Sequence, residues 1–176
     1  VRSFDGVWKD VHNYLVTTQD ITGEWSDPIY LNSSGFDPSL FHAPDGRKWV
    51  VNMLADHRDN RLFGGIVLQE FDMETGKMTG PVRMIFEGEG IKNVEGPHLY
   101  YRNGYYYLLM AAGGTEYDHR AILARSRDIT GPYEAHPGNP VLTTQGHPDW
   151  PLQKAGHGDL VEAPDGQWYI AFLCGR

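Results

Sequence analysis

The chain has 176 residues and a formal net charge of −8, with 15 Lys and Arg against 23 Asp and Glu. This acidic balance argues against a nucleic-acid partner or an anionic membrane surface, because both favour basic clusters. No apolar run reaches the roughly 18 residues of a membrane-spanning helix. The single cysteine, Cys174, excludes an internal disulfide and a cysteine-rich zinc site, and gives little information about the compartment.

The composition is rich in turn formers and in aromatic residues. Glycine occurs 21 times and proline 11 times, beside 5 Trp, 10 Tyr and 7 Phe. Aromatic residues favour strands, and glycine and proline favour tight turns. Long windows with the apolar spacing of a helix are hard to find. The sequence therefore predicts an all-β protein.

An internal repeat organises the chain. Three segments begin at an ionisable residue and run nine residues to a turn glycine, at 37–46, 95–104 and 157–166. A second hairpin-like element alternates with them, at 14–23, 65–76 and 121–131. Asp-Gly and Asn-Gly turns between β-rich runs are strong hairpin signals. The repeat unit is therefore two hairpins, with a period of about 60 residues.

Four strands at this period are typical of a β-propeller blade. The order of elements predicts the outer half of one blade, two full blades and the beginning of another. About three blade-equivalents do not close a ring of about four or more blades. We therefore expect residues 1–176 to be a fragment of a single β-propeller domain that lacks the first blade and the closing segment. An open β-sandwich is the alternative.

The first residues of the three repeats are Asp37, Glu95 and His157. The first strand of each blade lines the propeller axis, so these residues are expected to converge. Any one of them fits a structural role at a strand edge, but three ionisable residues together favour a functional site. A carboxylate beside a glutamic acid raises the pKa of that acid. A Glu that stays protonated near neutral pH can supply the acid half of glycoside hydrolysis.

Several motifs resemble glycoside hydrolase family 43, and above all its β-xylosidases. They lie in order along essentially the whole chain, at Gly35–Phe41, Asn52–Arg58, Phe63–Ile66, Glu95–Leu99, Gly113–Thr115 and Leu152–Gly158. The resemblance implies a five-bladed propeller and hydrolysis with inversion. It also implies an Asp general base, a Glu general acid and a second Asp that raises the pKa of the acid.

The resemblance assigns roles to individual residues. Glu95 matches the general acid and Asp37 the pKa modulator, whereas no residue of this chain matches the general base. Candidate substrate-binding residues are His157, at the floor of the pocket, Thr115, Phe36 and Arg58. Arg58 belongs to a charged cluster at 56–61, for which a solvated loop is the default interpretation. No cofactor is expected and zinc-site spacing is absent, but a calcium ion near His157 stays open.

The predicted function is that of an inverting, exo-acting β-1,4-xylosidase on xylo-oligosaccharides. An α-L-arabinofuranosidase on arabinosides, or a bifunctional enzyme, is the alternative within the class. The chain alone is expected to be inactive because the base is absent from it. A non-catalytic carbohydrate-binding propeller is an alternative of another class, and a protein-interaction propeller is disfavoured because WD and kelch signatures are absent. A homo-oligomer of the intact protein is left open, as is a cytoplasmic or secreted location.

Overall fold

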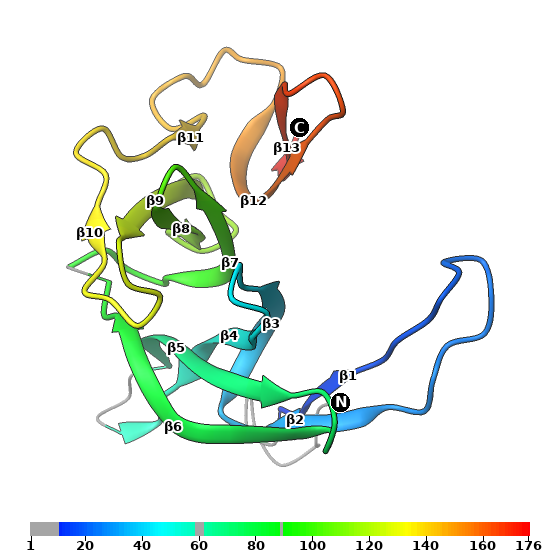
Figure 1. Cartoon of the computed structure of the whole chain (residues 1–176). Helices are drawn as coiled ribbons and strands as arrows, with labels where there is room; N and C mark the ends of the chain where they lie inside the picture. The colour runs from blue at the N-terminus through cyan, green and yellow to red at the C-terminus, as the bar shows by residue number, and fades with distance from the viewer. Residues whose placement is uncertain (1–10, 59–61, 89) are drawn as a thin grey trace.

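The computed structural model describes residues 11–58, 62–88 and 90–176. All thirteen regular elements in these ranges are strands (Figure 1). The strands are β1 (Asn13–Leu15), β2 (Ile29–Asn32), β3 (Gly35–His42), β4 (Lys48–Ala55), β5 (Phe63–Asp72), β6 (Lys77–Phe86), β7 (Glu95–Arg102), β8 (Tyr105–Ala112), β9 (Arg120–Ser126), β10 (Glu134–Ala135), β11 (Leu142–Thr143), β12 (Gln153–Glu162) and β13 (Trp168–Gly175). Nothing in the described part forms a helix long and apolar enough to cross a membrane.

The strands form four antiparallel sheets that follow one another along the chain. Sheet β3-β4-β5-β6 is the first complete blade, and β7-β8-β9-β10 is the second, with β11 also paired to β9. Two-stranded sheets, β1-β2 and β12-β13, lie on either side of them (Figure 1). The predicted fold, a partial β-propeller whose ring this chain does not close, is confirmed.

The hydrophobic core lies between blades, on both faces of the sheets. Val50 and Val51 are both buried, because successive strand residues point to opposite faces. Val51 belongs to the main core, which joins the two complete blades and includes Met53, Ile66, Leu68, Leu108, Met110 and Ile122. Val50 packs with Leu31 and Phe71 in a smaller core between β2 and the first complete blade. Each buried aliphatic side chain contributes about 1.5–3 kcal/mol to folding, so blade stacking stabilises the arrangement of the inner strands.

The inner strands β3, β7 and β12 lie next to one another, with β7 between the other two (Figure 1). Two hydrogen bonds that involve side chains connect β3 to β7 across the seam between the blades. The Ser39 hydroxyl donates to the carbonyl of Pro97 at 2.7 Å, and the backbone N–H of Gly96 donates to Asp37 Oδ2 at 3.1 Å. All three inner strands begin their hairpins in the same sense, so their first residues lie at one end of the assembly.

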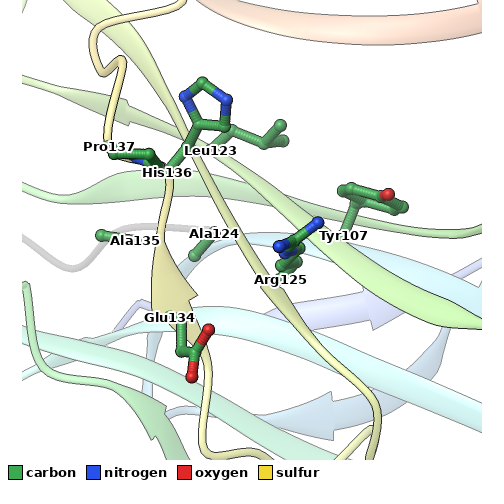
Figure 2. A pocket seen from close by; sticks show the side chains of 8 residues that line it. All are labelled: Tyr107, Leu123, Ala124, Arg125, Glu134, Ala135, His136 and Pro137. Carbon is green, nitrogen blue, oxygen red and sulfur yellow. The ribbon is translucent and has the colours of Figure 1, made fainter.

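The outer part of the second complete blade carries a hollow that lies away from that end. Its volume is about 350 Å³, and its lining is Tyr107, Leu123, Ala124, Arg125, Glu134, Ala135, His136 and Pro137 (Figure 2). Tyr107 pairs with Arg125 across the strands, whereas Glu95 pairs with Ala111 at the other end of β8. The hollow is therefore separate from the predicted site.

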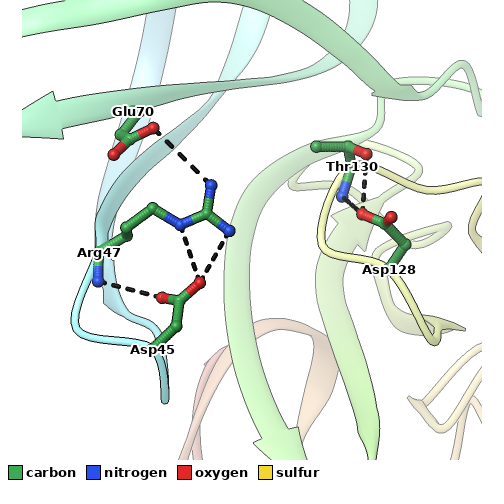
Figure 3. Close-up of polar contacts among 5 residues, drawn as sticks. All are labelled: Asp45, Arg47, Glu70, Asp128 and Thr130. Atoms are coloured by element: carbon green, nitrogen blue, oxygen red, sulfur yellow. Dashed lines mark hydrogen bonds and ion pairs between the residues drawn. The ribbon is translucent and has the colours of Figure 1, made fainter.

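The repeated tetrapeptide Asp-Ile-Thr-Gly forms the same turn in both of its copies. Asp20 Oδ1 accepts from the backbone N–H of Thr22 at 2.9 Å and from its hydroxyl at 2.8 Å. Asp128 Oδ1 accepts from Thr130 in the same way, both times at 2.8 Å (Figure 3). These bonds favour the charged carboxylate and hold the pKa of both aspartates below their ordinary value. The repeat in sequence is a repeat of local structure.

The first Asp-Gly turn is held by an exposed ion pair. Asp45 accepts from the backbone N–H of Arg47 at 3.1 Å, and Arg47 Nη2 lies 2.7 Å from Asp45 Oδ2 (Figure 3). Arg47 also lies 3.9 Å from Glu70 on β5. The guanidinium of Arg47 lowers the pKa of Asp45 through these hydrogen bonds. Because the ion pair between Asp45 and Arg47 is exposed, it fixes the turn but adds little to the folding free energy.

Candidate active site

Each inner strand begins with a β-bulge that turns one residue into left-handed backbone. The strand registers shift after Phe36 in β3, after Glu95 in β7 and after Gly156 in β12. The φ angles at the bulges are 53° at Asp37, 55° at Gly96 and 50° at His157. This conformation is unfavourable for residues other than glycine and clusters at functional sites. The bulges therefore mark this end of the blades as the candidate site.

The bulges correct one detail of the sequence interpretation. The repeat predicts that Asp37, Glu95 and His157 share one register, but Gly96 occupies the position that matches the other two. The cause is the turn, since β7 and β8 are joined by residues 103–104 and β3 and β4 by residues 43–47. Counting back nine residues from the turn glycine therefore lands one residue early. Glu95 still lies directly beside the shared position.

The three predicted residues meet around Gly96. Asp37 accepts the Gly96 N–H from one side, at 3.1 Å. The His157 ring covers Gly96 from the other side, so closely that a Cβ on Gly96 would lie 2.7 Å from His157 Nε2. Glu95 is the next residue along β7. Asp37, Glu95 and His157 thus come from three blades and lie at one place.

Glu95 is a half-buried carboxyl group with a raised pKa. Burial penalises the charged form and is the larger cause, and the negative charge of Asp37 adds to it. Together they raise the pKa of Glu95 to about 7. A substantial fraction of Glu95 is therefore protonated at neutral pH and can donate a proton.

Two of the other predicted substrate contacts, Thr115 and Phe36, differ in their exposure. Thr115 is exposed in the loop that follows β8, at the end of that strand next to Glu95. Phe36 is only 8% exposed and packs edge-on against Phe63, with ring centroids 6.1 Å apart. Phe36 therefore belongs to the main core, the surface left to a sugar is small, and its contact with a substrate stays a prediction.

Arg58 is exposed, but its guanidinium is bonded within its own loop. Its Nε lies 2.9 Å from Asp56 Oδ1, and its Nη2 lies 3.1 Å from Asp56 Oδ2. Asp56 is buried, so the pair anchors the loop after β4. Asp59 and Arg61, which complete the predicted charged cluster, lie outside the described residues. The structure shows Arg58 as a loop anchor, and contact with a substrate stays a prediction.

A polar group at the seam between β7 and β12 was not found from the sequence. Tyr100 donates its hydroxyl proton to Asp159 Oδ1 at 2.5 Å and accepts the backbone N–H of Leu160 at 2.8 Å. His98 Nδ1 lies 3.7 Å from the same oxygen of Asp159. The signal in the sequence is the alternation of His98 and Tyr100, which places both on one face of a strand.

Within the described ranges, no three His, Cys, Asp or Glu side chains are placed to hold a metal ion. The calcium ion near His157 therefore has no three-ligand set of this kind in the structure, and no chemical step below uses it. It stays a prediction.

A family model described as "Glycosyl hydrolases family 43" matches residues 3–176. The chain belongs to glycosyl hydrolase family 43. The resemblance stated from the motifs is thus confirmed, and the site described above is the candidate active site of a family 43 chain.

Named relatives in family 43 match the chain along its whole length. It is 60% identical to "Xylosidase/arabinosidase 43B" of Humicola insolens and 55% identical to "Beta-xylosidase" of Bacillus subtilis, each over all of this chain and 33% of the relative. The crystal structure of a xylan β-1,4-xylosidase from Bacillus halodurans C-125 is 60% identical, with a TM-score of 0.95, over 99% of this chain and 34% of that one. The chain therefore spans about a third of the length of these relatives.

Gly96 is a position of the family 43 site at which an added side chain would clash. Gly96→Ala should destabilise the chain by about 1–3 kcal/mol, because the new Cβ meets the His157 ring in left-handed backbone. Gly80→Ala is the matched control, since Gly80 has a φ of 67° with nothing within 4 Å of its Cβ position. Urea unfolding followed by tryptophan fluorescence measures both. Equal losses at the two positions would show that backbone strain alone, and not the His157 contact, sets the cost.

Proposed function

We propose that the protein is an inverting glycoside hydrolase that releases xylose from the non-reducing ends of β-1,4-linked xylo-oligosaccharides. Glu95 is the general acid of this proposal. The observation that carries it is the position of Glu95, half-buried beside Asp37, where burial and charge raise its pKa to about 7. A glycosidic oxygen needs a proton as the bond to it breaks, and an acid with this pKa holds one at neutral pH.

Inversion divides the work between an acid and a base on opposite faces of the sugar. Glu95 gives its proton to the leaving oxygen as the bond from that oxygen to the anomeric carbon breaks. A general base takes a proton from the water that attacks the same carbon. We place this base outside residues 1–176. The charge of Asp37 raises the pKa of Glu95 and so helps Glu95 regain its proton from solvent, and His157 forms the floor of the pocket.

The substrate class is supported by the names of the relatives. Those at 55% identity and above carry xylosidase in their names, and a "Xylan 1,3-beta-xylosidase" of Vibrio is 46% identical. The Humicola insolens and Butyrivibrio fibrisolvens relatives are named for both xylosidase and arabinosidase. A bifunctional enzyme that also acts on α-L-arabinofuranosides is therefore the second candidate.

The proposal can be tested in a chimera in which residues 1–176 replace the matching segment of the Bacillus halodurans xylosidase. The identity of 60% and the TM-score of 0.95 favour a folded graft. We expect this xylosidase chimera to release xylose from xylobiose, with the α-anomer as the first product in proton NMR. The same assay on an aryl arabinofuranoside measures the second activity. A folded chimera that binds xylobiose without hydrolysing it would support the non-catalytic alternative, and the β-anomer as first product would overturn inversion.

The chain alone should show little or no glycosidase activity. It contributes an acid but, in this proposal, no base, and its sheets form a partial ring. The open side exposes apolar residues of the β12-β13 sheet, with Val161 at 59% and Leu173 at 56% exposure, and such surfaces favour association. Purified 1–176 is assayed on an aryl xyloside and sized by light scattering. Turnover equal to that of the chimera, from a clean monomer, would contradict the proposal.

A further inference from the structure

Two seams flank strand β7, and the candidate acid lies at their common end. The seam with β3 carries the Asp37 and Ser39 contacts with Gly96 and Pro97. The seam with β12 holds His157 over Gly96. Whatever fixes β12 against β7 therefore also fixes the groups around Glu95.

In the part of the second seam nearest the bulge, the side-chain contacts converge on one carboxylate oxygen. Asp159 Oδ1 accepts the Tyr100 hydroxyl at 2.5 Å and lies 3.7 Å from His98 Nδ1. The Tyr100 oxygen in turn accepts the backbone N–H of Leu160 at 2.8 Å. Tyr100 thus bonds both a side chain and the backbone of β12, and holds that strand in one register.

The register of these contacts matches that of the other seam. Asp159 lies two residues after the bulge residue His157, just as Ser39 lies two residues after the bulge residue Asp37. In both seams this position makes a side-chain hydrogen bond to β7. Such a bond limits how far the bulge residue can move, because only one residue separates the two.

We propose that Tyr100 and Asp159 are positioning residues whose hydrogen bond clamps β12 to β7 and thereby keeps the His157 ring over Gly96, beside Glu95. The inference rests on the proposed function of Glu95. The ring keeps water away from the backbone next to Glu95, and burial is the larger cause of the raised pKa of that residue. Loosening the clamp should therefore expose Glu95 to water and favour its charged form.

The protonation states of the clamp suit this role. Burial, and the hydrogen bond to Asp159, raise the pKa of Tyr100 well above its usual range, so its hydroxyl remains a donor. Burial lowers the pKa of His98 despite the nearby charges of Asp159 and Asp37, and His157 also lowers it. The ring of His98 is therefore neutral near pH 7, and the clamp does not depend on its charge.

The test measures the titration of Glu95 in the chain itself, by carbon NMR of labelled glutamate carboxyls. Glu95→Gln assigns the signal. Tyr100→Phe removes the hydroxyl and should lower the Glu95 midpoint by about one pH unit, and Asp159→Ala should do the same. Asp159→Asn keeps an acceptor for Tyr100 and should leave the midpoint in place. Tyr101→Phe is the matched control, because Tyr101 is an exposed neighbour on the same strand, and its ring packs at a tilt against Tyr106.

The outcomes separate the clamp from the proposed function. A raised Glu95 midpoint that Tyr100→Phe and Asp159→Ala do not move would overturn the clamp alone. An equal shift of the Glu95 midpoint in Tyr101→Phe would also overturn the clamp. The same holds if Asp159→Asn lowers the midpoint as far as Asp159→Ala does, because the charge of Asp159 and not its hydrogen bond would then be responsible. An ordinary midpoint in the unmodified chain would instead remove the observation on which the proposed function rests.

Discussion

Glu95→Ala in the xylosidase chimera should lower kcat/KM on xylobiose by about 10²–10⁴-fold, the usual contribution of a general acid. Xylobiose has a poor leaving group, which needs a proton as it departs. An aryl xyloside with an activated phenol leaves with little protonation, so the loss on that substrate should be much smaller. Steady-state kinetics on the two substrates, with the same enzyme preparation, measures the difference.

The control for this prediction is another glutamate on an inner strand. Glu162 on β12 forms an exposed ion pair with Arg102 at 3.2 Å, away from the bulges. Glu162→Ala should change kcat/KM on either substrate by no more than a few-fold, since exposed ion pairs contribute little. If Glu95→Ala reduced kcat/KM on both substrates equally, Glu95 would support the structure or bind the sugar and would not act as the acid.

Asp37→Asn in the chimera should move the alkaline limb of the pH profile of kcat/KM toward lower pH. The charge of Asp37 helps to raise the pKa of Glu95, and Asn removes that charge while its oxygen can still accept the Gly96 N–H. The pKa of Glu95 then falls, the proton is lost at lower pH, and less of the acid form remains at pH 7. The rate at neutral pH should therefore drop, whereas KM for a neutral sugar should change less.

A distant aspartate serves as the control for this shift. Asp45 lies in an exposed turn, paired with Arg47 at 2.7 Å. Asp45→Asn should leave the alkaline limb unchanged. A limb that stays in place, or moves toward higher pH, in Asp37→Asn would show that Asp37 does not raise the pKa of Glu95, and the paired-carboxylate argument would fail.

The blades could be predicted from the sequence because their determinants are local. Turn residues such as Asp45-Gly46 and Asn103-Gly104, between runs of aromatic and aliphatic residues, specify hairpins without reference to distant parts of the chain. The repeated Asp-Ile-Thr-Gly formed the same turn twice, at Asp20 and at Asp128. The two complete blades and the half blades on either side of them follow from this local pattern.

The details of the site could not be predicted, because they depend on the register and on distant contacts. The sequence repeat alone puts Glu95 one residue out of register, because the turn at 103–104 is shorter than its counterpart. The hydrogen bond between Tyr100 and Asp159 joins residues 59 positions apart and has no local signature. The low exposure of Phe36, at 8%, follows from distant packing partners such as Phe63 and has no local signature, and its contact with a substrate stays a prediction.

The most direct test of the central claim is the titration midpoint of the Glu95 carboxyl in the unmodified chain, followed by carbon NMR from pH 3 to pH 9. The claim is that burial and the charge of Asp37 keep this group protonated near neutral pH. The structure predicts a midpoint of about 7. A midpoint near the ordinary glutamate value of about 4.3 would contradict the assignment of Glu95 as the general acid.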